Sequence, residues 1–101
     1  MNLQRKGCVV ITLDDVQYRW KAYSTKKGTE VRIAFNEIEG GQILVAQVPK
    51  LFNLKWVMPI IDFGHENGWL PDEEHKPLYI RKIKESFRLL TAEEVVEATS
   101  R

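Results

Sequence analysis

Residues 9–23 read VVITLDDVQYRWKAY, and this stretch decides the fold. Two runs rich in β-branched and aromatic residues flank Asp14 and Asp15, which fit a two-residue turn, so the sequence predicts a β-hairpin of residues 9–13 and 16–23. A longer loop stays open, because a type I′ turn prefers glycine where Asp15 stands, and a shift by one residue would invert the two faces. In this register one face of the hairpin is wholly apolar and forms the core side of a sheet. The predicted apolar pairs are Leu13 with Val16, Ile11 with Tyr18, and Val9 with Trp20.

Gly40 and Gly41 predict a second hairpin, because both can adopt the positive φ that a type I′ turn requires. Counting outward from this turn, apolar residues continue the core side of the first hairpin. The opposite side receives Ile38, Ile43 and Val45. The predicted pairs are Glu37 with Leu44, Phe35 with Ala46, and Ile33 with Val48.

A helix is predicted to follow, with Pro59 in its first turn and its end near Asn67. Proline is tolerated there because its missing N–H would have no partner in the helix. Asn67 and Gly68 fit a left-handed cap that turns Trp69 back as a buried anchor. The stripe expected to pack on the sheet, at positions i, i+3, i+4 and i+7, is Val57, Ile60, Ile61 and Gly64.

The remaining segment is open to two interpretations. Residues 76–80 read KPLYI and favour a short strand at the sheet edge, where proline is tolerated, yet residues 79–90 also fit a helical stripe. We expect the strand first and irregular or helical structure after it. Thr91 and Glu94 form a capping box that predicts a short helix over residues 92–98. The predicted fold class is therefore α+β: an antiparallel four-stranded meander of two hairpins, packed by one main helix. A short C-terminal helix follows, and the sequence leaves open a fifth strand at the sheet edge.

Composition predicts one globular domain spanning residues 1–101. Of the 101 residues, 44% are hydrophobic and 29% are charged, which is typical of a folded chain rather than a disordered one. The formal charge of +1 gives no global attraction to polyanions. Cys8 is the single cysteine, and no apolar run is long enough to span a membrane, so we expect a cytoplasmic protein with no membrane partner.

No motif points to catalysis or to a cofactor. Gly40, Gly41 and Gln42 spell the tripeptide of peptide release factors, but strand residues follow it instead of a basic and polar stretch. His65 and His75 lie near carboxylates without the spacing of a metal site. We therefore expect a protein that is not an enzyme and that has no cofactor and no metal.

Three motifs resemble those of a loose group of small uncharacterised bacterial proteins, some of the kind carried on mobile gene cassettes. They are YRW at residues 18–20, GQILV at residues 41–45, and the helix that closes in NGWLP at residues 67–71. The resemblance spans roughly residues 9–79. It implies a bacterial origin and carries over no activity.

Two functional hypotheses remain. The leading one is a protein-interaction module in which Ile38, Ile43 and Val45 bind another protein or a second copy of the chain, unless a segment of the chain itself covers them. The alternative is a domain that binds single-stranded nucleic acid through basic residues and an aromatic ring on the outer face of the first hairpin. The residues of this alternative are Arg19, Lys21, Tyr23, Lys26, Lys27 and Arg32.

Overall fold

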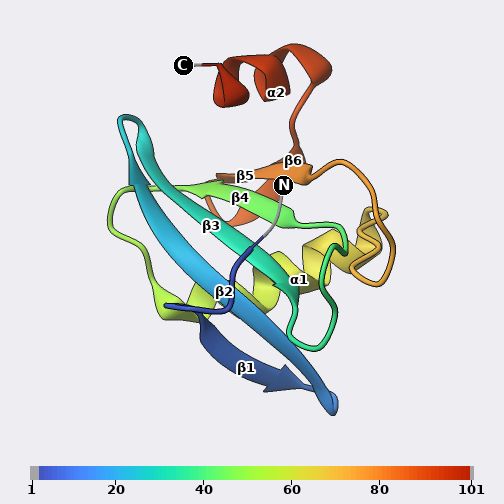
Figure 1. Ribbon diagram of the computed structural model, residues 1–101. Helices are drawn as coiled ribbons and strands as arrows, with labels where there is room; N and C mark the ends of the chain where they lie inside the picture. The colour runs from blue at the N-terminus through green and yellow to red at the C-terminus, as the bar shows by residue number, and fades with distance from the viewer. Residues whose placement is uncertain (1–2, 101) are drawn as a thin grey trace.

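The computed structural model describes residues 3–100, so the ends of the predicted 1–101 domain, residues 1, 2 and 101, lie outside the described residues. Within the described part, six strands form one sheet whose spatial order follows the chain (Figure 1). Every neighbouring pair is antiparallel except β4 with β5, which are parallel. The strands are β1 (Val9–Leu13), β2 (Val16–Thr25), β3 (Gly28–Phe35), β4 (Leu44–Val48), β5 (Leu78–Ile83) and β6 (Ser86–Leu89).

The first predicted hairpin is confirmed in its register. β1 and β2 pair with Leu13 opposite Val16, as the sequence predicts. Asp14 and Asp15 adopt φ values of 49° and 65°, so both lie in the left-handed region that a type I′ turn needs. Aspartate tolerates this conformation better than most residues, which explains how the turn forms without glycine.

The predicted second hairpin is wrong in its turn and in its register. Ile33 lies opposite Leu44 rather than Val48, and residues 36–43 form a long connection instead of a tight turn. Gly41 has no positive φ; its backbone lies so close to Pro71 that a Cβ atom there would collide with the Pro71 carbonyl oxygen. Because the register differs by four residues, an even number, the predicted faces of β3 and β4 are nevertheless preserved.

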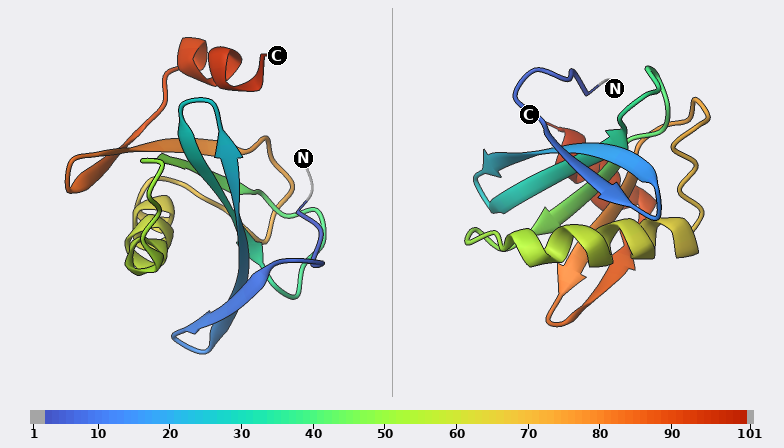
Figure 2. Two further views of the ribbon diagram at one scale, coloured as in Figure 1. Left: turned by 90° about the vertical axis from the view of Figure 1, so that its left-hand side faces the viewer. Right: turned by 90° about the horizontal axis from the view of Figure 1, so that it is seen from below.

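The predicted helix is confirmed. A 3-10 turn, Leu54–Trp56, leads into α1 (Val57–Glu66), and the predicted stripe of four residues is buried against the sheet. Asn67 ends the helix, Gly68 has a φ of 91°, and Trp69 turns back to donate a hydrogen bond from Nε1 to the carbonyl of Gln42 at 2.9 Å. Figure 2 shows α1 on one side of the sheet and the N-terminal segment on the other.

The strand interpretation of residues 76–80 is confirmed, but their predicted place at the sheet edge is wrong. β5 lies inside the sheet between β4 and β6, so the sheet has six strands rather than four or five. The β5–β6 turn contains Lys84 at a φ of 55°, with no glycine or proline to signal it. The capping box is confirmed: Thr91 and Glu94 bond each other's backbone N–H at the start of α2 (Ala92–Thr99).

Two apolar clusters lie on opposite faces of the sheet. The larger one fills the space between the sheet and α1 and includes Tyr18, Trp20, Ile33, Leu44 and Trp69. The smaller one lies on the other side, which we call the outer face. No helix in the described part of the chain is long and apolar enough to cross a membrane.

Candidate functional site

The predicted interaction patch is not exposed. Ile43 and Val45 lie on the outer face with exposed fractions of 2% and 0%, and Ile38 is half-buried. Ile43 and Val45 belong to the smaller cluster, which includes Leu3 of the N-terminal segment and against which Val95 of α2 packs. The sequence left open whether the chain covers this patch, and the structure shows that it does.

The nucleic-acid hypothesis expects Arg19 on an open face, and this is wrong. The Arg19 side chain is only 1% exposed. It donates from Nε to the carbonyl of Leu3 at 3.0 Å, and from Nη1 to the carbonyls of Phe35 and Ile38. Burial lowers the pKa of this guanidinium. Arg19 therefore fastens the N-terminal segment and the β3–β4 connection to β2, and no phosphate can reach it.

Lys21, Tyr23 and Arg32 are brought together as that hypothesis predicts. Lys21 and Arg32 lie opposite each other on β2 and β3, and both flank the Tyr23 ring. The distances to the ring centroid are 5.3 Å from Lys21 Nζ and 4.5 Å from Arg32 Cζ. Arg32 also pairs with Glu30 at 2.7 Å. This group is an aromatic ring between two cations on an open sheet face.

Two further arginines, Arg81 and Arg88, lie on the same face of the sheet as Lys21, Tyr23 and Arg32, and the sequence pattern did not reveal them. The strand register places Glu30 beside Gln47, Gln47 beside Arg81, and Arg81 beside Arg88, all on the outer face. The signal that could have found them is the period of two in residues 78–89, which is visible only once this segment is assigned as two strands.

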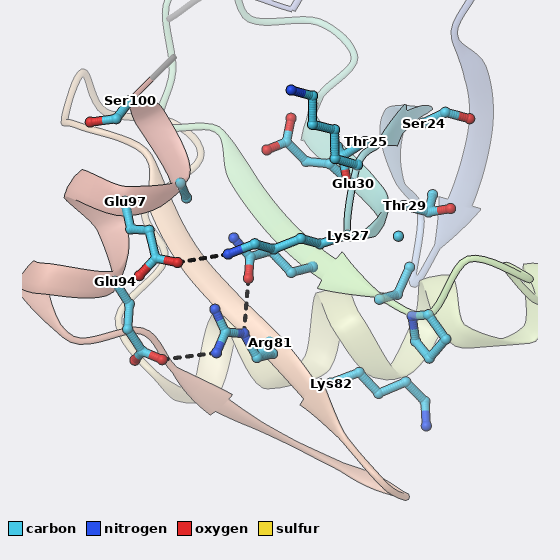
Figure 3. Close-up of a pocket in the computed structure, with 16 residues that line it drawn as sticks. Ser24, Thr25, Lys27, Thr29, Glu30, Arg81, Lys82, Glu94, Glu97 and Ser100 are labelled. Carbon is cyan, nitrogen blue, oxygen red and sulfur yellow. Dashed lines mark hydrogen bonds and ion pairs between the residues drawn. The ribbon is translucent and has the colours of Figure 1, made fainter.

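Lys26 and Lys27 lie apart from Tyr23, at the tight turn between β2 and β3. Beside this turn an open cleft of about 1000 Å³ separates the hairpin tip from α2 (Figure 3). Lys27 crosses the cleft to Glu97 of α2 at 2.7 Å, and Arg81 pairs with Glu94 of α2 at 2.9 Å. These cations hold the pKa of the Glu97 carboxyl below its usual range, and a hydrogen bond from Arg88 is the main cause of the lowered pKa of Glu94.

A different apolar surface is exposed beside α1. Leu51, Leu54 and Met58 have exposed fractions of 88%, 68% and 52%. Leu54 and Met58 are four residues apart where the 3-10 turn runs into the helix, and neither belongs to the buried stripe. We call Leu51, Leu54 and Met58 the α1 patch. The sequence pattern predicts the buried stripe of this helix but not this exposed patch.

The described residues offer no metal site and no activated nucleophile. No group of three potential metal ligands occurs among them. His65 hydrogen-bonds the hydroxyl of Tyr18 at 2.9 Å, and His75 contacts Glu73. Burial raises the pKa of the Cys8 thiol, which opposes formation of the reactive thiolate.

Comparison with known proteins returned no relatives: no family model, no curated protein and no solved structure matches the chain. Function must therefore be argued from the surfaces of this chain alone.

Proposed function

We propose that the chain is a non-enzymatic protein-interaction module that associates with a second copy of itself through the α1 patch. This keeps the class of function that the sequence favoured and moves the surface from the covered side of the sheet to the helix side. The observation that carries the proposal is the exposure of Leu51, Leu54 and Met58, three large apolar side chains within eight residues. Apolar groups gathered on a monomer surface commonly mark an interface.

The charges along α1 fit a second copy better than an unrelated partner. Lys50 in the loop before the 3-10 turn and Lys55 within that turn are exposed, and Asp62 and Glu66 are exposed towards the end of α1. Lys55 and Glu66 are separated by about three helical turns and so point to nearly the same side. Two antiparallel copies of α1 would place Lys55 of each beside Glu66 of the other. This is the reciprocal pairing that a two-fold interface requires.

The α1 patch needs support from its flanks. A stable interface buries about 800 Å² on each partner, more than one short helix offers. Val9, Val16 and Leu89 are exposed, and the strand register points each of them towards the α1 side of the sheet. They lie on β1, β2 and β6, and we assign them to the rim of the interface on either side of α1.

The first experiment is sedimentation of the full chain over a range of concentrations, with Leu54→Asp as the test variant. The wild type should show a concentration-dependent dimer. Leu54→Asp should raise the dissociation constant at least about tenfold, because an unpaired carboxylate would be buried at the contact. Val96→Asp is the matched control: Val96 is also an exposed apolar residue, but it lies on α2. A wild type that stays monomeric at every concentration would contradict the proposal.

A charge exchange tests the orientation. Lys55→Glu and Glu66→Lys should each weaken the dimer, because each places like charges together at two symmetric positions. The double variant, with both changes in one chain, should regain most of the wild-type affinity. If the double variant is weaker than either single variant, antiparallel pairing of α1 is wrong even where a dimer exists.

A further inference from the structure

The outer face of the sheet carries a set of cations that the proposed function does not use. They are Lys21, Lys26, Lys27, Arg32, Arg81 and Arg88, contributed by four strands and the β2–β3 turn. Among the strand residues that point to this face, Glu30 supplies the one carboxylate. The face is therefore strongly basic, although the chain as a whole has a formal charge of only +1.

The opposing charge comes from α2. This helix has the sequence AEEVVEAT, with three glutamates and no basic residue. Its ion pairs are made to these cations: Glu97 pairs with Lys27, and Glu94 pairs with Arg81 and with Arg88. Arg88 holds Glu94 with two hydrogen bonds of 2.7 and 2.6 Å. Arginine binds a phosphate group with the same bidentate hydrogen-bond geometry.

We propose that the outer face is a binding surface for single-stranded nucleic acid and that α2 is a detachable acidic lid whose carboxylates occupy the places of phosphates. This site is separate from the α1 patch, which lies on the other side of the sheet. It needs neither the dimer nor the residues assigned to it.

The lid is held weakly enough to be displaced. No residue of α2 is buried, and both side chains of the Lys27–Glu97 pair are mostly exposed to water. Exposed ion pairs add little to stability and are weakened further by salt. α2 does not pack closely against the hairpin tip, because an open cleft lies between them (Figure 3). Val95 and Ala98 provide partly buried apolar contacts to the sheet.

Tyr23 identifies the class of polyanion. Its ring is half-buried on the open sheet face, flanked by Lys21 and Arg32. Single-stranded nucleic acid is held in this way: bases stack on an aromatic ring or a guanidinium plane while neighbouring cations contact the phosphates. A double helix would not present unstacked bases to this ring.

The test is fluorescence anisotropy with a labelled thymidine oligonucleotide and the full chain, at about 50 and about 200 mM salt. Glu94→Gln combined with Glu97→Gln should bind about tenfold more tightly than the wild type, since the lid loses its ion pairs. Arg81→Gln introduced into that variant should reverse the gain, and Tyr23→Ala should weaken binding at both salt concentrations. Circular dichroism of each variant checks that the fold is intact.

Glu93→Gln is the matched control, because Glu93 lies on α2 and has the same charge, but no ion pair joins it to the sheet in residues 3–100. A lid predicts a much smaller effect for Glu93→Gln than for Glu94→Gln. Equal effects would show a simple change of net charge and would overturn the lid. No binding by the wild type or by the double variant at the lower salt would overturn the site, as would binding to anionic phosphatidylserine vesicles in place of the oligonucleotide. Leu54→Asp must leave oligonucleotide binding intact, so failure of the dimer and failure of this site are distinguishable.

Discussion

Trp69 is the residue whose removal should cost this fold most. It is 2% exposed and lies with its ring centroid 4.9 Å from that of His65 and 5.9 Å from that of Tyr18. Truncation of a buried tryptophan to alanine costs about 3–5 kcal/mol. The carbonyl of Gln42 would also lose its bond from Trp69 Nε1, and an unpaired buried carbonyl adds about 1–3 kcal/mol. Trp69→Ala should therefore remove about 4–8 kcal/mol from the free energy of unfolding.

A loss of this size is comparable to the whole stability of a domain, about 5–15 kcal/mol. We expect Trp69→Ala to lower the unfolding midpoint by about 20 °C or more, or to prevent folding. Trp69→Phe keeps most of the ring and loses the donor, so its cost should be well under half as large. Urea unfolding followed by far-ultraviolet circular dichroism measures both, with the exposed neighbour Leu70→Ala as control. The reasoning is refuted if Trp69→Ala unfolds within about 1 kcal/mol of the wild type.

Three further predictions concern the connections and α2. In urea unfolding, Gly41→Ala should cost about 3 kcal/mol because its Cβ would collide with the Pro71 carbonyl. Gly40→Ala should cost only about 1 kcal/mol for its positive φ, whereas a type I′ turn would make the two costs equal. Arg19→Met should cost about 3 kcal/mol in thermal unfolding, because it leaves backbone carbonyls unpaired. The pKa of Glu94 is depressed in the folded protein, so the stability it gives α2 is present above the ordinary carboxyl pKa and is lost as pH falls through the lower, folded value. The protection of α2 amides against exchange, relative to an unstructured chain, should therefore persist at about pH 4 and fall only in stronger acid, and Glu94→Gln should remove that dependence.

The elements that the sequence predicts correctly are those whose causes are local. The β1–β2 register follows from a two-residue turn and the residues beside it. The limits of α1 follow from Pro59, from the buried stripe and from the Asn67 cap. In each case the physical reason lies within a few residues of the feature, and so a single sequence contains it.

The β3–β4 connection was mispredicted because the reason for its glycine is distant in the chain. A glycine pair between apolar runs is typical of a tight hairpin. Gly41 is instead required where its backbone meets Pro71, thirty residues further on, and Gln42 donates its backbone N–H to the carbonyl of Glu73 at 2.7 Å. The β5–β6 hairpin was missed for a related reason, since Lys84 takes the left-handed conformation that glycine usually marks.

Alternation along a strand assigns a residue to a face, but it does not show which part of that face is covered. Lys21 and Arg19 are neighbours on the same face of β2, yet one borders an open surface and the other is buried. The difference comes from the segment around Leu3, whose carbonyl accepts a hydrogen bond from Arg19. The structure therefore brings Lys21, Tyr23 and Arg32 together, as the nucleic-acid hypothesis expects. It buries Arg19, which the hypothesis expects to be exposed.

The two covers of the outer face differ in how they are attached, and this difference has a functional consequence. The N-terminal cover is fixed by a buried leucine, Leu3, and by the buried guanidinium of Arg19, so removing it would expose apolar surface and take one hydrogen-bond partner from a buried charge. The α2 cover has no buried residue, its Lys27–Glu97 pair is mostly exposed to water, and its Glu94 pairs with Arg81 and Arg88 are only partly shielded. A polyanion could replace each of these carboxylates with a phosphate, and the chain would lose only the partly buried contacts of Val95 and Ala98 with the sheet. The end of the outer face beneath α2 is therefore the part where a ligand can compete with the protein's own structure.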